Sequence, residues 1–185
     1  MNPRPHGHVR LVREGEAPVR RREADDFDAL FEQHWRYVAR IAHRMLGRTD
    51  EVDDAVQDVF AILYRRRKEV AELESVKQWI GAVTVKRCYQ LLRRRSRRRW
   101  TSGDDEASFL QVRDPRVDPE QQAMIARVGQ VLDKMAPRQR VAWTLRYLEG
   151  ETLEEVARLA NTSLATAKRR IAAAHLTIQE ALCDG

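Results

Sequence analysis

The fold is decided by residues 152–183, which have the sequence TLEEVARLANTSLATAKRRIAAAHLTIQEALC. Thr152 followed three residues later by Glu155 is a capping box that opens a helix. Asn161 tolerates the left-handed backbone of a tight turn, and Ser163 can cap the next helix. A short helix, a three-residue turn and a longer helix predict a helix-turn-helix, whose second helix enters the DNA major groove. The alternative is a generic helix pair with a solvated basic face.

The second helix of this pair has a predicted inner face that is apolar and an outer face that is basic. The inner face follows a helical period from Ala167 to Leu182. The outer face presents Thr166, Lys168, Arg169 and Arg170, with no acidic residue before Glu180. We therefore expect this face to meet DNA.

A second basic element precedes this motif by about sixty residues. Eight basic residues and no acidic residue lie between Lys86 and Arg99. Trp79, Tyr89 and Trp100 accompany them, and aromatic rings beside arginines suit the stacking of single-stranded bases. The alternatives are a solvated face or a targeting tract for the basic run, and core packing for Trp79.

Five acidic residues fall within residues 50–58, at the start of a predicted helix in this otherwise basic half. Acidic side chains are favourable in a first helical turn, and neither a histidine nor a glycine-rich loop accompanies them. A solvated face or a docking surface for a basic partner is therefore favoured over a metal or acid–base site.

Charge and composition indicate two helical domains. Residues 1–100 carry 23 basic and 15 acidic side chains, whereas residues 101–185 carry 11 and 13. We predict an all-α protein with a flexible basic tail at 1–23, a helical domain at 24–100, an acidic flexible linker at 101–118 and a helix-turn-helix domain at 119–185.

Several classes of protein are not expected. No apolar run is long enough to span a bilayer, and the first residues lack the apolar core of a signal peptide, so a cytoplasmic protein without membrane insertion is expected. Two cysteines and unspaced histidines predict neither a metal site nor a cofactor, and the absence of a P-loop or nucleophile motif argues against an enzyme.

These motifs resemble those of the extracytoplasmic-function (ECF) group of the bacterial sigma-70 family of transcription initiation factors. DEVDDAVQDVFAILYRRR (50–67) resembles the polymerase-binding helix, and WIGAVTVKRCYQLLRRRSRRR (79–99) resembles the segment that melts and binds the −10 element. MAPRQRVAWTLRYLEGETLEEVARLANTSLATAKRRIAAAH (135–175) is similar to the −35-binding lobe. The chain departs from the family at Lys86, Gln90, Asn161, Ala173 and His175, where Asn, Asp, Gly and two arginines are usual.

The resemblance implies site residues for three partner surfaces. Core RNA polymerase, through its β′ clamp helices, would meet Asp54, Gln57, Asp58 and Phe60. The −10 strand would meet Trp79, Lys86, Arg87, Gln90, Arg93, Arg94 and Arg95. The −35 duplex would meet Ser163, Thr166, Lys168, Arg169, Arg170 and Ala173, with the second lobe near the β flap of the polymerase. An anti-sigma factor is a further partner that the resemblance suggests.

Two other functions remain open. A helix-turn-helix regulator that never joins RNA polymerase would explain the C-terminal unit but not the acidic helix. An RNA-binding or scaffold protein would explain the basic run but not the capped helix-turn-helix.

Overall fold

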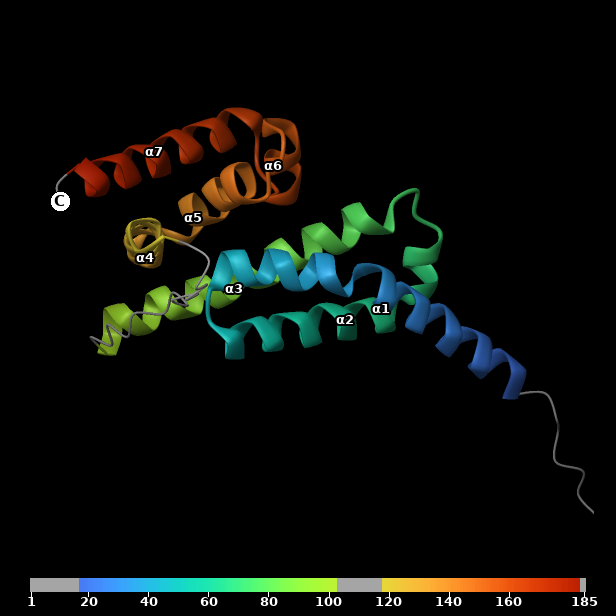
Figure 1. Cartoon of the computed structure of the whole chain (residues 1–185). Coiled ribbons are helices and arrows are strands. Elements are labelled where there is room, and N and C mark those ends of the chain that lie inside the picture. Colours follow the sequence, from blue (N-terminus) through green and yellow to red (C-terminus); the bar gives the residue numbers. More distant parts are fainter. Residues whose placement is uncertain (1–16, 103–117, 184–185) are drawn as a thin grey trace, which may run out of the picture.

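A computed structural model describes residues 17–102 and 118–183, and all regular structure within these ranges is helical (Figure 1). The first lobe contains α1 (Ala17–Leu46), α2 (Thr49–Ala71) and α3 (Val76–Ser102). The second lobe contains α4 (Pro119–Lys134), α5 (Pro137–Trp143), a π-helical turn η1 (Thr144–Leu148), α6 (Leu153–Leu159) and α7 (Leu164–Cys183). The prediction of an all-α chain is confirmed for this part of the molecule.

The three helices of the first lobe pack around an apolar core. Val38 of α1, Val59 and Leu63 of α2, and Ile80 of α3 are each fully buried in it. Gly47 ends α1 with a φ of +77°, a conformation that a side chain would strain. The Ser75 hydroxyl caps α3 by accepting from the Gln78 amide at 3.2 Å.

The N-terminus of α2 has no side-chain cap. Thr49 and Asp50 are residue types that favour the N-cap position, but α2 begins at Thr49 and its N-cap residue is Arg48, whose side chain makes no capping bond. Asp50 instead accepts from Arg48 at 3.2 Å, so the local ion pair holds its carboxylate.

In the second lobe, prolines open two helices. Pro119 and Pro137 both lie in a first turn, where the missing amide costs no hydrogen bond. Helical structure continues from Pro137 to Leu148, but its second half is the π-helical turn η1, which the apolar period does not predict. Gly150, with a φ of +75°, ends this segment.

Two predicted boundaries meet the edges of the described residues. The helix α1 begins at Ala17, so residues 17–23, which the sequence assigns to the tail, are helical. Pro18 stands in the first turn, where proline is tolerated, and the residues after it are mostly helix formers. The rest of the predicted tail and residues 103–117 of the predicted linker lie outside the described residues.

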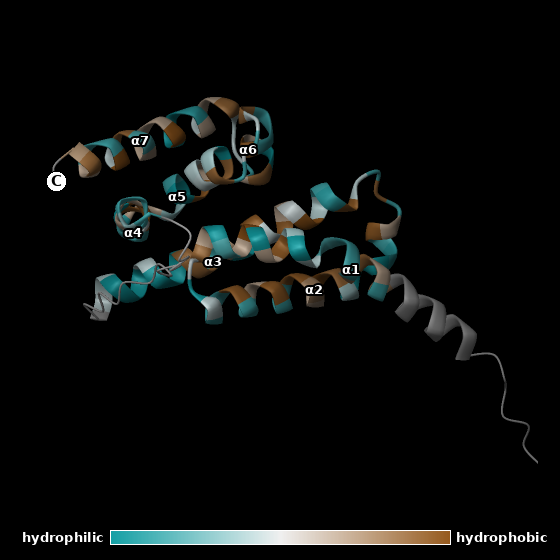
Figure 2. Ribbon diagram, in the orientation of Figure 1, coloured by the Kyte–Doolittle hydropathy of each residue, from teal (hydrophilic) through white to brown (hydrophobic). Residues whose placement is uncertain are grey.

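One apolar cluster spans the two lobes, in addition to a cluster within each lobe. The spanning cluster joins Met45 and Leu46 of α1 and Val85 of α3 to Leu145 and Leu159 of the second lobe. Figure 2 shows α1 and α3 on the side of the first lobe that faces the second lobe, with α2 on the far side. No helix in the described ranges is long and apolar enough to cross a membrane.

Candidate nucleic-acid interface

The turn before α7 is built as the sequence predicts. Asn161 has a φ of +46°, the left-handed conformation that the tight turn requires. The Ser163 Oγ accepts from the Thr166 amide at 3.2 Å, and its hydroxyl donates to the Thr166 Oγ1 at 2.9 Å. These bonds fix the first turn of α7 and hold its N-terminal face open to solvent.

The short helix α6 has half of the predicted capping box. The Thr152 Oγ1 accepts from the Glu155 amide at 3.2 Å. The Glu155 carboxylate, which the capping box would turn back toward Thr152, binds Arg158 instead, with an Nε–Oε2 distance of 2.8 Å. This charged bond is the main reason that the pKa of Glu155 lies below its usual value.

The outer face of α7 presents basic side chains, and the helix buries Ala167 and Ile171 on the opposite side. Lys168 and Arg169 are exposed, and Arg170 is half-buried. Burial, and next the nearby charge of Arg138, lower the pKa of Arg170. Ala173 is half-buried one turn further along α7.

The exposed edge of α3 presents most of the predicted −10 residues. Lys86, Gln90, Arg93 and Arg94 are exposed on it. Trp79 packs half-buried against the core of the first lobe, with the Arg66 guanidinium 5.8 Å from the ring centroid. Trp79 is therefore partly a core residue, as the core interpretation predicts.

Arg87 joins the basic helix to the acidic one. Its guanidinium pairs with the carboxylate of Asp58 on α2, and its Nη1 also donates to the Gln90 Oε1 at 3.1 Å. A residue predicted to bind DNA and one predicted to bind the polymerase therefore neutralise each other.

Arg95 occupies a different place from its neighbours in the basic run. Its side chain is 7% exposed, whereas that of Arg98 is 72% exposed. The Arg95 guanidinium pairs with Glu51 of α2 and lies 3.3 Å from the Asp133 Oδ1 in the second lobe. The predicted contact of Arg95 with DNA does not fit this arrangement, because a buried, paired guanidinium cannot reach a phosphate.

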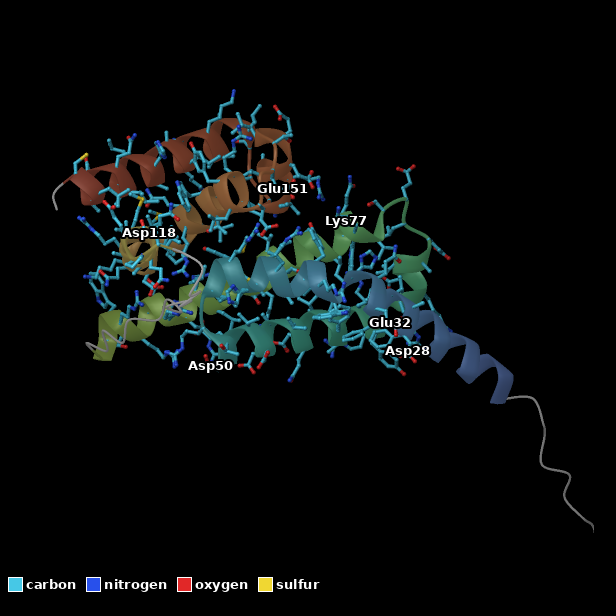
Figure 3. The ribbon with its side chains drawn as sticks, viewed as in Figure 1. Asp28, Glu32, Asp50, Lys77, Asp118 and Glu151 are labelled. Atoms are coloured by element: carbon cyan, nitrogen blue, oxygen red, sulfur yellow. The ribbon has the colours of Figure 1, made fainter. Side chains whose placement is uncertain are left out.

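The predicted polymerase-binding residues also divide into exposed and buried side chains. Asp54 and Gln57 are exposed on α2, and Figure 3 shows Asp50 at the beginning of that helix, on the outer side of the first lobe. Phe60 is only 5% exposed and lies 4.6 Å from Phe31, ring centroid to centroid. Phe60 is therefore a core residue that packs α2 against α1, and its role in polymerase binding stays a prediction.

Two acidic residues that the sequence analysis did not single out hold the two lobes together. Asp133 accepts from Arg140 at 2.6 Å and from Arg95 of α3 at 3.3 Å. Glu149 accepts from Arg40 and Arg44 of α1. The sequence could have indicated that Asp133 is buried, because it directly follows Leu132 at the edge of the apolar stripe of α4. Periodicity does not reveal which lobe supplies the cations.

Within the described ranges, no group of three or more His, Cys, Asp or Glu side chains could hold a metal ion. The chemistry available at these surfaces is ionic and aromatic. The capped turn, the basic face of α7 and the basic edge of α3 define a two-lobed helical protein of the nucleic-acid-binding class.

Comparison with known families specifies the class. Residues 30–98 match the family model described as Sigma-70 region 2, and residues 125–176 match Sigma-70, region 4. The two matches cover the two lobes in the order that the resemblance implies. The chain belongs to the sigma-70 family, and the curated relatives that it matches are ECF sigma factors.

Curated relatives share about a quarter of the sequence. The chain is 28% identical over 149 residues to the ECF RNA polymerase sigma factor SigE of Mycolicibacterium smegmatis, covering 78% of this chain and 57% of that protein. It is 25% identical over 164 residues to the probable ECF RNA polymerase sigma factor SigI of Mycobacterium tuberculosis, covering 84% and 55%. The chain thus spans little more than half the length of these two relatives.

Solved structures share the fold. The sigma factor RpoE in complex with the anti-sigma factor NepR from Bartonella quintana has a TM-score of 0.64 and 20% identity, over 85% of this chain and 96% of that chain. CnrH in complex with the cytosolic domain of CnrY has a TM-score of 0.57 and 18% identity, over 85% and 88%.

Proposed function

We propose that the chain is an alternative sigma factor that binds core RNA polymerase and directs promoter-specific initiation. The observation that carries this proposal is the pairing, in one chain, of a capped helix-turn-helix with a basic helix next to an acidic helical face. A regulator that only binds duplex DNA needs the helix-turn-helix but neither the basic helix nor the acidic face. Family membership in both lobes supports the same conclusion.

In this proposal the two functional units are residues 24–100 and 119–185. The exposed side of α2, with Asp54 and Gln57, docks on the β′ clamp helices of the polymerase, while the second lobe lies near the β flap. Exposed carboxylates are suited to a basic partner because complementary charge speeds association and fixes the register of docking.

The outer face of α7 would bind the −35 duplex. Lys168 or Arg169 would donate to guanine O6 and N7, whereas Arg170 and Thr166 would bind phosphates. The exposed edge of α3 would hold the melted −10 strand through a group of four side chains, Lys86, Gln90, Arg93 and Arg94. Neither step involves covalent chemistry, and the protein would act in the cytoplasm, where polymerase and promoter are found.

An anti-sigma protein is a further partner that we propose. RpoE was solved with the anti-sigma factor NepR bound, and CnrH with the cytosolic domain of CnrY. The partner of this chain would restrain it until a signal releases it.

Run-off transcription with purified core polymerase and a library of promoter fragments tests the proposal. Initiation at particular fragments that depends on this chain supports a sigma factor. Binding to duplex DNA without initiation would instead identify a helix-turn-helix regulator that does not join the polymerase.

A charge reversal tests the docking surface. Asp54→Lys should weaken retention of the chain on immobilised core polymerase, because the exposed carboxylate becomes a like charge for a basic partner. The matched control is Glu72→Lys, which makes the same change at the exposed far end of α2. Equal retention of both variants and the unaltered chain would remove α2 from the docking surface.

A further inference from the structure

A pocket with a volume of about 300 Å³ lies where the C-terminal end of α3 meets α4 and the start of α5 (Figure 1). Ligand pockets have volumes of about 300–1,000 Å³, so this one has room for one small molecule. Of the site residues that the sequence analysis assigns to polymerase or DNA, only Arg95 lines it. The proposed function therefore leaves this pocket without a role.

One part of the pocket is apolar. Leu92 of α3 and Met135, between α4 and α5, are 4% and 8% exposed and line it together with Pro137. Trp100 of α3 also lines the pocket, yet it is 92% exposed, more than any other large hydrophobic residue in the described ranges. A planar ring stacked on Trp100 would remove this apolar surface from water, which is favourable.

The other part of the pocket is basic, and its lining holds four cations but only one carboxylate, that of Asp133. Arg95 and Arg140 pair with this carboxylate, whereas Arg99 donates to the Asp133 backbone carbonyl. The fourth cation, Lys134, is exposed. In the described part of the chain no carboxylate pairs with Lys134 or Arg99, so two positive charges are left for a ligand.

Arg140, on the buried side of the pocket, lacks one acceptor. It is 1% exposed, and its Nη1 and Nη2 donate to the Asp133 Oδ1 at 2.6 Å and to the Leu46 carbonyl at 3.2 Å. Its Nε is buried and has no hydrogen-bond partner among the described residues. Burial most of all lowers the pKa of this guanidinium, and the charges of Arg95 and Arg99 act in the same direction. A negatively charged ligand would offset the repulsion among these three cations.

We propose that this pocket binds a mononucleotide, with its base stacked on Trp100 and its phosphate beside Lys134 and Arg99. A phosphate monoester carries about −1.5 to −2 charges at pH 7 and therefore balances the two cations that lack a carboxylate. Its oxygens accept strong hydrogen bonds from guanidinium and ammonium groups. The site goes beyond the proposed function, since it involves neither polymerase nor promoter.

Both parts of the pocket are needed to choose this ligand. Inorganic phosphate would balance the charges but would leave Trp100 and the apolar side chains uncovered. A neutral aromatic molecule would cover them but would leave the cations without an anion. A nucleotide supplies a planar base and a phosphate in one molecule, and every base has a face that stacks. Nucleotides occur both free and at the end of a nucleic-acid strand, and the small volume favours the free form.

Calorimetric titration of the full-length chain with each of the common ribonucleoside 5′-monophosphates tests the proposal. At least one of them should bind. The matching nucleoside, which lacks the phosphate, should bind at least about tenfold more weakly, because its charge-assisted hydrogen bonds are lost. Ribose 5-phosphate, which lacks the base, should bind at least about fivefold more weakly, because stacking of one base strengthens binding by about 5- to 150-fold.

Two exposed side chains provide variants that leave the buried core untouched. Trp100→Ala removes the stacking surface and should weaken nucleotide binding at least about fivefold. Lys134→Glu places a carboxylate beside the phosphate and should weaken binding at least about tenfold. The matched controls, Trp35→Ala and Lys77→Glu, make the same changes at exposed residues that do not line the pocket, and both should bind like the unaltered chain.

Equal binding of the nucleotide and of ribose 5-phosphate would reduce the pocket to an anion site and overturn the proposal. Nucleotide binding that neither Trp100→Ala nor Lys134→Glu weakens would also overturn it, as would an absence of binding for every nucleotide. A 5′-phosphorylated trinucleotide that binds more tightly through the same two residues would replace the free nucleotide by the end of a strand. These measurements use neither polymerase nor promoter, so their outcome is independent of the sigma function.

Discussion

Removal of the Asp133 carboxylate should be among the most destabilising single changes in this protein. Asp133 and Arg140 have side chains that are 5% and 1% exposed, and Arg95 is 7% exposed. Asp133→Ala leaves two buried guanidinium groups without the oxygen that they share. Arg140 keeps two carbonyl acceptors, and Arg95 keeps Glu51, so neither cation is fully stripped.

The size of the effect follows from this partial compensation. Breaking a buried ion pair by removing one partner costs about 3–5 kcal/mol. Because other acceptors remain, the expected loss in the free energy of unfolding is about 3 kcal/mol. With a urea slope of about 2 kcal/mol/M, the unfolding midpoint should fall by about 1.5 M. Since one buried cluster spans both lobes, we expect a single transition in which both unfold together.

A double-mutant cycle separates pairing from packing. Asp133→Leu alone should destabilise strongly, whereas Asp133→Leu combined with Arg140→Met should recover much of the loss, because apolar groups can replace a buried pair at little cost. Urea unfolding followed by circular dichroism measures both. A loss below about 1 kcal/mol for Asp133→Ala, or strictly additive effects in the cycle, would refute the argument that this network is desolvated and coupled.

Three other predictions concern DNA binding and pH. Arg169→Ala should relax base preference in a selection from randomised −35 duplexes, whereas Arg170→Ala should weaken binding to all sequences alike. Replacing Arg93 and Arg94 by alanine should lower the log–log salt slope of forked −10 DNA binding by about 0.7–0.9 for each phosphate that is no longer neutralised. Burial, and next the charge of Lys77, lower the pKa of His34 below 6.5, so unfolding takes up a proton and stability should fall as the pH drops below about 6.5.

Each of these predictions has a matched control. For the salt slope it is Arg36→Ala, which removes an exposed cation of α1 instead of α3 and should leave the slope unchanged. For the pH effect it is His43→Gln on the exposed side of α1, which should keep the acid dependence that His34→Gln removes. For α7, an unaltered consensus from the Arg169→Ala selection would place base recognition elsewhere on the helix.

Sequence reasoning succeeds where the controlling interactions are local. The turn at Asn161 and the caps at Ser163 and Thr152 depend on residues within three positions, and the structure has them as predicted. The Glu155 carboxylate binds Arg158 instead of closing the capping box, because a charged partner one turn away competes with a backbone amide. Local pattern therefore determines the helix-turn-helix but not every bond in it.

Sequence reasoning fails where a side chain's partner comes from another lobe. The family motif associates Phe60 with polymerase binding, whereas the helical period that buries Val59 and Leu63 also places Phe60 in the core, as the structure has it. Glu149 has no predicted role, since its cationic partners Arg40 and Arg44 precede it by more than a hundred residues. Periodicity shows that a residue faces inward, but it does not identify the element it meets there.

Arg95 shows how local sequence pattern and contacts between the lobes combine within one helix. In the sequence it is one of eight basic residues, and their repulsion is costly unless an anion neutralises it. The helical period separates it from the others, since it follows Leu92 by three positions on the buried stripe of α3, while Arg93 and Arg94 turn to solvent. A guanidinium on a buried stripe requires a carboxylate, and α3 receives one from its own lobe and one from the second. The same basic run can thus present charge to a polyanion on one face and hold the two lobes together on the other.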